Sequence, residues 1–298
     1  MSNINLIIEE RAADLGQFLV GRLLPFRQKR MVGPFIFIDH MGPVKLKERE
    51  NFDVMPHPHI GLSTLTFLFE GSIMHRDTLG NEIEIEPGAV NWMTAGKWIV
   101  HSERTPPRLR HSNLFMHGLQ IWVALPKELE GMDPEFFHVE REDVPQWDQD
   151  GLQLRLVAGE AMGKKSPVPV YSRLYMLEVK SKDHNVVSFG EHLYGESGLY
   201  ILSGSIQSEG QEYGPKQLLV AKDSSLCEFT ISPDSTIYIF GGEPFPENRF
   251  IDWNFVSSNK ETIQRAKDKW KSQDFEKIKG DDTEFTPYPT LDTSLKRK

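Results

Sequence analysis

Two short motifs in the first half of the chain carry side chains that bind transition metals. His57 and His59 are separated by one proline, and His101 and Glu103 by one serine. Residues i and i+2 of a β-strand point to the same face, so each motif can direct both side chains into one interior. Three imidazoles and one carboxylate suit Fe(II), Mn, Ni, Cu or Zn better than Mg or Ca. The residues alone leave a metal site and two polar strand edges both open, although two such pairs strengthen the metal interpretation.

Short extended runs surround both motifs and would position them. Residues 65–69 (LTFLF) and 82–86 (EIEIE) alternate in polarity, the pattern of half-buried antiparallel strands, and Gly, Pro, Asn and Asp stand between the runs. Similar runs resume after an acidic, proline-containing connector. We therefore predict an all-β fold of two tandem β-barrels, with a first domain at 1–130, a connector at 131–150 and a second domain at 151–298.

The end of the chain differs in kind, because residues 257–280 carry a helical pattern. Ile263, Ala266 and Trp270 fall on one helical face, with Ser or Asn available as an N-cap and Gly280 as a stop. We expect this C-terminal α-helix to dock through that face. The residues after Gly280 are predicted to form an extended, loosely held tail.

Bulk composition restricts the class of protein. The net charge of −9 argues against direct nucleic-acid binding, which needs clustered Lys and Arg. Cys227 is the only cysteine, so no intrachain disulfide can form, and we expect it in a buried strand without a nucleophilic role. The sequence shows no signal-peptide pattern and no apolar run of about 18 residues. We expect a cytoplasmic monomer without membrane contact.

Longer stretches around the two motifs are recognisable. The sequences PHPHIGLSTLTFLFEGSIMHRD and EPGAVNWMTAGKWIVHSE closely resemble the pirin family, whose members have the bicupin fold. LLPFRQKRMVGPFIFIDHMGP and WNFVSSNKETIQRAKDKW resemble it too. The resemblance implies two tandem cupin barrels of the jelly-roll type, and a single metal, expected to be Fe, held by His57, His59, His101 and Glu103. It also implies that the second cupin has lost its site.

One departure from the family pattern concerns the residues after the first motif. The family commonly reads H-P-H-x-G-F-E-T, whereas this chain has Leu62 and Ser63 in place of the aromatic residue and the carboxylate. The ligands themselves are unchanged, so metal binding should survive. The substitution instead affects the surroundings of the ligands or the pocket lining, which weakens any inference about substrate.

The resemblance implies two functions of different classes. The first is an oxygenase of the quercetin 2,3-dioxygenase type, in which the metal binds a flat flavonol-like substrate and Glu103 accepts its hydroxyl proton. The alternative is a non-enzymatic, iron-dependent and redox-sensing regulator that binds a protein partner. A metal-binding cupin without turnover is a third possibility. Pocket access separates the first two, since a wide channel to the metal favours the enzyme.

The remaining candidate residues have weaker patterns. His40 is either a neighbour of the metal site or a satisfied core histidine, and Asp77 is placed to pair with His75 in a turn. Further histidines without paired spacing are interpreted as structural or exposed: His75, His111, His117, His184 and His192. Strand aromatics are interpreted mainly as core: Phe67, Phe69, Trp92, Trp98 and Trp122.

Overall fold

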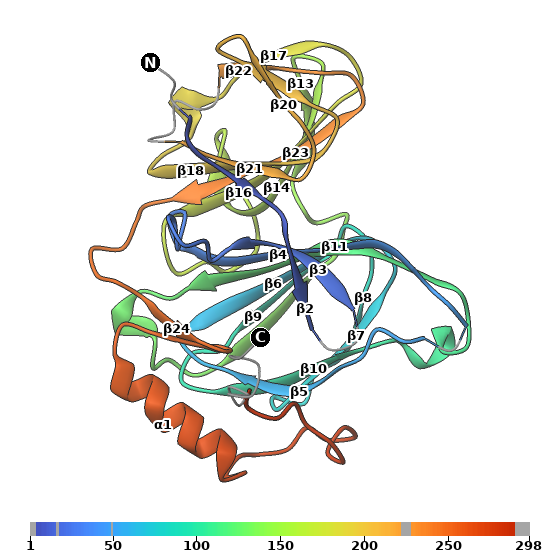
Figure 1. Ribbon diagram of the computed structural model, residues 1–298, viewed down its shortest axis with the longest axis vertical. Helices are drawn as coiled ribbons and strands as arrows, with labels where there is room; N and C mark the ends of the chain where they lie inside the picture. Colours follow the sequence, from blue (N-terminus) through green and yellow to red (C-terminus); the bar gives the residue numbers. More distant parts are fainter. Residues whose placement is uncertain (1–3, 16–17, 49, 222–227, 290–298) are drawn as a thin grey trace, which may run out of the picture.

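The computed structural model describes residues 4–15, 18–48, 50–221 and 228–289. Within these residues the chain forms two β-barrels stacked along the long axis, with one α-helix at the end of the first barrel (Figure 1). Three short 3-10 helices lie in connections, at Pro107–Leu109, Lys127–Leu129 and Gly190–His192. The predicted all-β class, with two barrels and a C-terminal helix, is confirmed. Cys227 lies outside the described residues.

The first barrel packs a seven-stranded sheet against a four-stranded sheet. The larger sheet has the order β12 (Glu135–Val139), β9 (Val90–Thr94), β6 (Leu62–Glu70), β11 (Leu114–Ala124), β4 (Phe35–Leu46), β3 (Leu19–Leu24) and β2 (Arg11–Asp14). The smaller sheet has the order β5 (Val54–His59), β10 (Ile99–Arg104), β7 (Ile73–Asp77) and β8 (Glu82–Ile85). Both motifs of the sequence lie in this smaller sheet.

The second barrel repeats this arrangement. Its larger sheet has the order β1 (Ile4–Glu9), β21 (Gln217–Ala221), β18 (Glu196–Ser203), β23 (Ser235–Gly242), β16 (Leu174–Ser181), β14 (Leu152–Ala161) and β13 (Gln146–Gln149), with β15 (Lys164–Lys165) paired to β14. Its smaller sheet has the order β17 (Asn185–Ser188), β22 (Glu228–Ile231), β19 (Ile206–Ser208) and β20 (Gln211–Tyr213). The pairs within these sheets are antiparallel.

The two larger sheets share one apolar core. Leu65 and Phe67 of β6 lie in the same cluster of buried residues as Tyr200 and Tyr238 of the second barrel. Strand β6 is therefore buried over Leu62–Leu68 instead of half-exposed, because the second barrel covers its outer face. The other half of the alternation, which includes Thr66, points into the first barrel. Polar side chains of β6 thus face the interior, where the metal-ligand motifs lie.

Both ends of the chain cross between the barrels. Strand β1 pairs with β21 of the second barrel, whereas β2, which follows it directly, pairs with β3 of the first. After the second barrel the chain returns as β24 (Phe250–Asp252), β25 (Phe255–Ser257) and α1 (Lys260–Lys271), beside β5 of the first barrel (Figure 1). A parallel bridge joins Ile60 to Phe255. Helix α1 packs on the first barrel, although more than a hundred residues of the second barrel separate the two in the chain. The domain boundaries at residues 130 and 150 remain a prediction.

Helix α1 docks as predicted but ends earlier. Ile263, Ala266 and Trp270 are buried, and the Asn259 side chain accepts a hydrogen bond from the Glu261 N–H at 2.8 Å as N-cap. The predicted stop at Gly280 is wrong, because the helix ends at Lys271 and Gln273 takes a positive φ of 60°. The chain then turns back so that the Phe275 ring stacks on Trp270. Tertiary packing, which periodicity does not reveal, sets this end.

Residues 281–289 are not the loosely held tail that the sequence predicts, and the remainder of that predicted tail, residues 290–298, lies outside the described residues. Asp281 accepts two hydrogen bonds from the Arg104 guanidinium, at 2.8 and 2.9 Å. The Thr286 N–H donates to the Pro56 carbonyl at 2.9 Å, and its own carbonyl accepts from the Trp270 indole at 3.0 Å. The segment is therefore fixed along β5, at the edge of the metal-ligand sheet.

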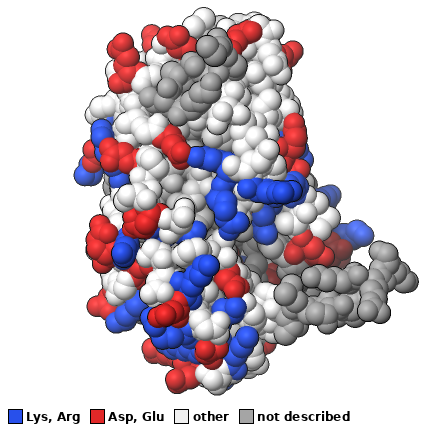
Figure 2. Space-filling view, turned by 60° about the vertical axis from the view of Figure 1, so that its left-hand side comes forward, with Lys and Arg blue, Asp and Glu red and all other residues white. Residues whose placement is uncertain are grey.

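The surface carries both signs of charge. Figure 2 shows one face of the molecule, on which Lys and Arg side chains gather across the middle while Asp and Glu side chains lie above and below. Over the whole chain 43 acidic residues outnumber 34 basic ones. Further Lys and Arg side chains lie among the acidic ones below this group, so the face carries mixed charge (Figure 2).

Candidate metal centre

Strands β5 and β10 bring the two motifs side by side. They pair antiparallel, with His101 opposite His57 and Ile99 opposite His59, and an irregularity follows before Glu103. Strand β5 contains Pro56 and Pro58, which a central strand would not tolerate, but β5 is the edge strand of its sheet and needs fewer N–H donors. The predicted juxtaposition of the motifs is therefore present.

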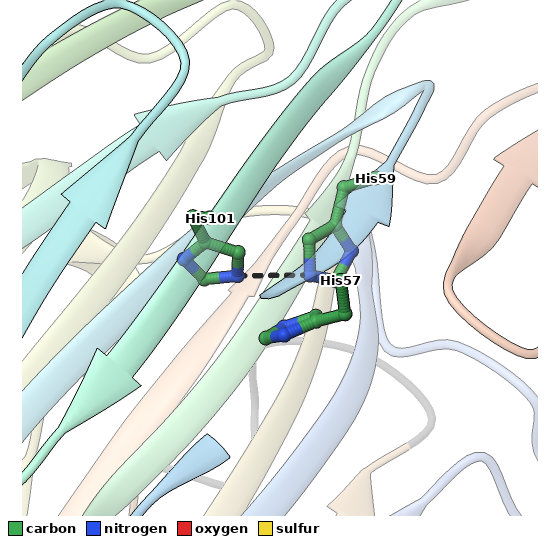
Figure 3. A group of neighbouring side chains, drawn as sticks. All are labelled: His57, His59 and His101. Carbon is green, nitrogen blue, oxygen red and sulfur yellow. Dashed lines mark hydrogen bonds between the residues drawn. The ribbon is translucent and has the colours of Figure 1, made fainter. Parts of the chain in front are cut away.

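Three imidazoles converge at one point inside the first barrel. The ligand nitrogens of His57, His59 and His101 all lie within 4.8 Å of one another, and all three side chains are buried. Figure 3 shows His57 and His59 from β5 facing His101, with a dashed line joining the Nε2 atoms of His59 and His101 at 3.1 Å. Among the described residues this is the one group of three or more ligand side chains so close together.

Glu103 lies near this group but outside it. Its buried carboxylate accepts a hydrogen bond from the Thr66 hydroxyl at 3.0 Å, and it lines the same cavity as His57 and His59. Burial raises the pKa of this carboxyl group, against the opposing effects of His75 and Thr66. Its role as a fourth ligand remains a prediction.

The outer nitrogens of two ligands are held by backbone carbonyls. Nδ1 of His57 lies 2.8 Å from the Met55 carbonyl oxygen, and Nδ1 of His59 lies 3.2 Å from that of Asn254. A carbonyl only accepts, so each Nδ1 carries the proton and each Nε2 has a free lone pair. Metal-binding histidines are commonly oriented in this way.

Outside the ligand group, His101 is backed by two further side chains. Its Nδ1 lies 3.5 Å from Nδ1 of His75, whose Nε2 lies 3.0 Å from the Asp77 carboxylate. If the Asp77 carboxylate is ionised, His75 donates from Nε2 and accepts at Nδ1, which leaves the His101 proton on Nδ1. Both Nε2 atoms joined in Figure 3 then present lone pairs to each other.

A cation between the two Nε2 atoms would remove the repulsion between their lone pairs. Two unprotonated nitrogens 3.1 Å apart repel each other unless a positive charge lies between them. Nitrogens bound to one metal at about 2.1 Å and at right angles lie about 3.0 Å apart. The donor set and its spacing therefore fit a transition-metal ion.

The protonation states agree with ligand chemistry. Burial lowers the pKa of His57 to about 4, and it lowers the pKa values of His59 and His101 well below the ordinary value. The charge of neighbouring histidines adds to this effect at His59 and His101. All three rings are thus neutral near pH 7, which is the form that binds metals.

A cavity of about 650 Å³ reaches the histidines. Trp122 and Phe37 stack 4.0 Å apart in its wall, and the edge of Trp122 meets the His59 ring at 5.1 Å. Arg22 lies over the Phe37 ring and forms a bidentate ion pair with Asp39. The cavity lining also includes residues from the returning C-terminal segment: Trp253, Asn254, Thr286 and Pro289. The cavity therefore gives a small molecule access to His57 and His59.

The two departures from the pirin pattern lie behind this wall. Leu62 is fully buried in a cluster with Phe37 and Trp122, and the Ser63 hydroxyl pairs with that of Thr94 at 2.9 Å. Neither residue is part of the cavity lining. They affect how Trp122 and Phe37 are supported and do not touch a ligand in the cavity.

The structure also shows the positions of the histidines outside the three-histidine group, which the sequence alone left open. His40 is buried away from the cluster, with Nδ1 2.6 Å from Glu10 and Nε2 2.9 Å from His117, so it is a satisfied core histidine. His111, His184 and His192 are exposed, as expected. The sequence pattern indicates a structural or exposed His75 and does not reveal its contact with His101 inside the barrel. The H-x-D spacing of His75 and Asp77 was the available signal, but without strand order it could not be connected to His101.

The strand aromatics divide between core and cavity. Phe67 and Trp92 are core residues as predicted, and Phe69 packs against the same core. Trp98 packs against the cluster around α1. Trp122 is buried and also forms part of the cavity wall.

Within the described residues, no helix is long and apolar enough to cross a membrane.

Comparison with protein families and solved structures agrees with this geometry. The family profile described as Pirin matches residues 17–123, and that described as Pirin C-terminal cupin domain matches residues 176–276. A "Pirin-like protein" of Caulobacter vibrioides is 45% identical over 289 residues, which cover 96% of this chain and 99% of the relative.

Two further relatives carry the name of an enzyme. A Pseudomonas aeruginosa protein named "Putative quercetin 2,3-dioxygenase PA1205" is 36% identical over 269 residues, covering 90% of this chain and 84% of the relative. The crystal structure of a quercetin 2,3-dioxygenase from Acinetobacter baumannii superposes with a TM-score of 0.86 at 33% identity, covering 96% of this chain and 95% of that one. Fold and sequence thus point to the same group of proteins.

Proposed function

We propose that this chain, which belongs to the pirin family, is a metal-dependent oxygenase that cleaves a flavonol of the quercetin type. The observation that carries the proposal is an aromatic-lined cavity of about 650 Å³ that reaches two histidines, His57 and His59, of the neutral three-histidine group. Its volume falls in the range of about 300 to 1,000 Å³ typical of small-ligand sites. The names of two similar proteins support the same reaction.

The proposed cofactor is one divalent metal ion. His57, His59 and His101 would hold it through Nε2, with Glu103 as the fourth ligand. Fe(II) is the first candidate, and Mn, Ni, Cu and Zn suit the same donor set. When bound, such an ion supplies a Lewis acid that lowers the pKa of a coordinated substrate hydroxyl.

Glu103 has the properties of the proton acceptor in this reaction. Its carboxylate lines the same cavity as His57 and His59, within reach of a substrate bound there. The flavonol hydroxyl would give its proton to a Glu103 oxygen, while the Thr66 hydroxyl keeps the carboxylate in place. The stacked pair of Phe37 and Trp122 would bind the flat rings and exclude water.

The alternative function, an iron-dependent regulator with a protein partner, fits this cavity less well. A regulator that registers only the charge of its metal needs no small-molecule access to it. The cavity shares its lining with two ligand histidines, which supports a site for substrate.

The test is metal-dependent consumption of quercetin. Chelator-free protein is analysed for metal, and then loss of quercetin absorbance and O₂ uptake are followed after anaerobic reconstitution with Fe(II), Mn(II), Ni(II) or Cu(II). We expect matched loss of both in wild type and neither in His101→Ala. Stoichiometric metal without turnover for any ion would overturn the oxygenase and favour the regulator.

A further inference from the structure

Only one of the three ligand histidines is backed by a chain of side chains. Behind His101 stand first His75 and then Asp77, on the neighbouring strand β7. His57 and His59 instead face neutral backbone carbonyls. The outer nitrogen of His101 therefore contacts a charged pair of side chains, whereas those of His57 and His59 contact the backbone.

The chain behind His101 is buried and fixed. Both His75 and Asp77 are at most 2% exposed, and the His75 ring stacks on Phe136 at 4.5 Å with an angle of 22° between the rings. Strand pairing places Asp77 opposite His101 and His75 opposite Glu103, so the backbone itself sets the spacing. Packing and strand register therefore both hold the two side chains in place.

Asp77 is held as an anion. It accepts hydrogen bonds from the backbone N–H groups of Leu79 and Asn81 and from the Asn81 side chain, at 2.9 to 3.1 Å. His75 adds a further contact at 3.0 Å, and hydrogen bonds donated to a carboxylate stabilise its charged form. A full negative charge therefore stands at the end of the chain.

We propose that His75 and Asp77 are positioning residues that fix the tautomer of His101 and increase the electron donation of its Nε2 to a bound metal. The inference rests on the metal site of the proposed function and deepens it. Because an anion polarises the His75 ring and that ring accepts from His101 Nδ1, His101 becomes a stronger donor than His57 or His59. A stronger donor tightens metal binding and favours the higher oxidation state of iron.

A purely structural role must be separated from this one, because Asp77 also closes the turn between β7 and β8. Gly80→Ala is a matched control for that turn. Gly80 has a φ of +90°, where a side chain is strained, yet an added Cβ would meet nothing within 4 Å. This variant should weaken the turn and leave the contact between His75 and Asp77 unchanged.

Three variants interrupt the chain at different points. His75→Phe keeps a ring against Phe136 but removes both hydrogen bonds, and His75→Asn retains an acceptor near Nδ1 while losing the link to Asp77. Asp77→Asn removes the charge. His138→Phe serves as a second control, because His138 bonds Asn91 and touches no ligand.

Two readouts are measured without flavonol: the metal dissociation constant by chelator competition, and the reduction potential of bound iron by spectroelectrochemistry. We expect His75→Phe to weaken metal binding about 10- to 100-fold and to raise the potential. Asp77→Asn should shift both in the same direction, and His75→Asn should recover part of the affinity. Gly80→Ala and His138→Phe should match wild type in both readouts.

Either of two results would overturn the inference: an unchanged affinity and potential in His75→Phe, or the same changes in Gly80→Ala as in Asp77→Asn. Wild-type protein that takes up no divalent metal would overturn the inference together with the metal site. Metal binding that depends on His75, in a protein that never consumes quercetin, would overturn the oxygenase and leave the inference supported.

Discussion

The two barrels place different side chains on equivalent sheets. In the first barrel, the four-stranded sheet directs His57, His59 and His101 to a common point inside. In the second barrel, the four-stranded sheet contributes apolar side chains to a closed core, among them Ile206 and Ile231. The described part of the second barrel has no comparable group of metal ligands.

The first barrel therefore carries the candidate functional site, whereas the second barrel mainly contributes to the stability of the fold. Buried imidazoles contribute less to folding than aliphatic side chains, because each loses hydration that its hydrogen bonds only partly replace. The described residues of the second barrel include no buried imidazole, and this barrel shares a large apolar cluster with the first. A site that is costly to bury can therefore persist in one barrel while the other stabilises the pair.

Removing a ligand from the first barrel should have the largest effect. We expect His101→Ala to weaken metal binding more than about 100-fold, beyond the usual loss for an outer contact, and to abolish turnover. Metal analysis after dialysis and quercetin-dependent O₂ uptake measure this. His138→Phe, with full metal content, is the control, and equal metal in both variants would remove His101 from the site.

Opening a cavity in the second barrel should affect stability alone. Leu177 is fully buried in its core, so Leu177→Ala should lower the free energy of unfolding by about 2–5 kcal/mol. Urea unfolding measures this loss, and chelator competition on the folded variant should return the wild-type metal affinity. A drop in affinity comparable to that of His101→Ala would show that the barrels do not divide the two tasks.

The buried histidines should also make the metal-free protein sensitive to acid. Burial lowers the pKa of His57 from 6.5 to about 4. Below pH 6.5 the unfolded chain therefore binds a proton at His57, whereas the folded chain binds it only near pH 4. The resulting stability is fully present above the unfolded pKa and declines as pH falls through this window, by about 2 kcal/mol between pH 7 and pH 5. His59 and His101 act in the same direction.

The measurement is urea unfolding of the apo-protein at pH 7 and pH 5. The variant His57→Phe lacks this titration, so its stability should fall less across the same interval. A pH dependence identical to that of wild type would contradict the lowered pKa. The second barrel provides no counterpart for comparison, since His184 and His192 are exposed.

The smallest expected effect concerns the family departure at Leu62. Because Leu62 is fully buried beside Trp122 and Phe37, Leu62→Phe overfills the wall and should destabilise the protein by about 1–3 kcal/mol. Metal content should be unchanged, while quercetin affinity should shift with the repositioned wall. Differential scanning calorimetry and a binding titration measure the two, and loss of metal would indicate that Leu62 supports the ligands directly.

Local spacing predicted the parts of the molecule that depend on local geometry. The i, i+2 pattern was sufficient to place His57 with His59 on one face of a strand, and alternating runs identified the barrels. The contact of His75 with His101 depends on β7 lying next to β10, which no local pattern specifies. The same holds for the early end of α1 and for residues 281–289, whose partners Arg104 and Pro56 lie far away in the sequence.

The crossing of the chain between the barrels ties the assembly of the histidine group to the order of synthesis. The Asn254 carbonyl that orients His59, and the Thr286 N–H that bonds the Pro56 carbonyl beside His57, follow the second barrel in the chain and are synthesised after it. The first barrel is translated early, yet its ligands gain their final orientation only after the second barrel has emerged. Any metal that this group selects is therefore selected after the second barrel has been made.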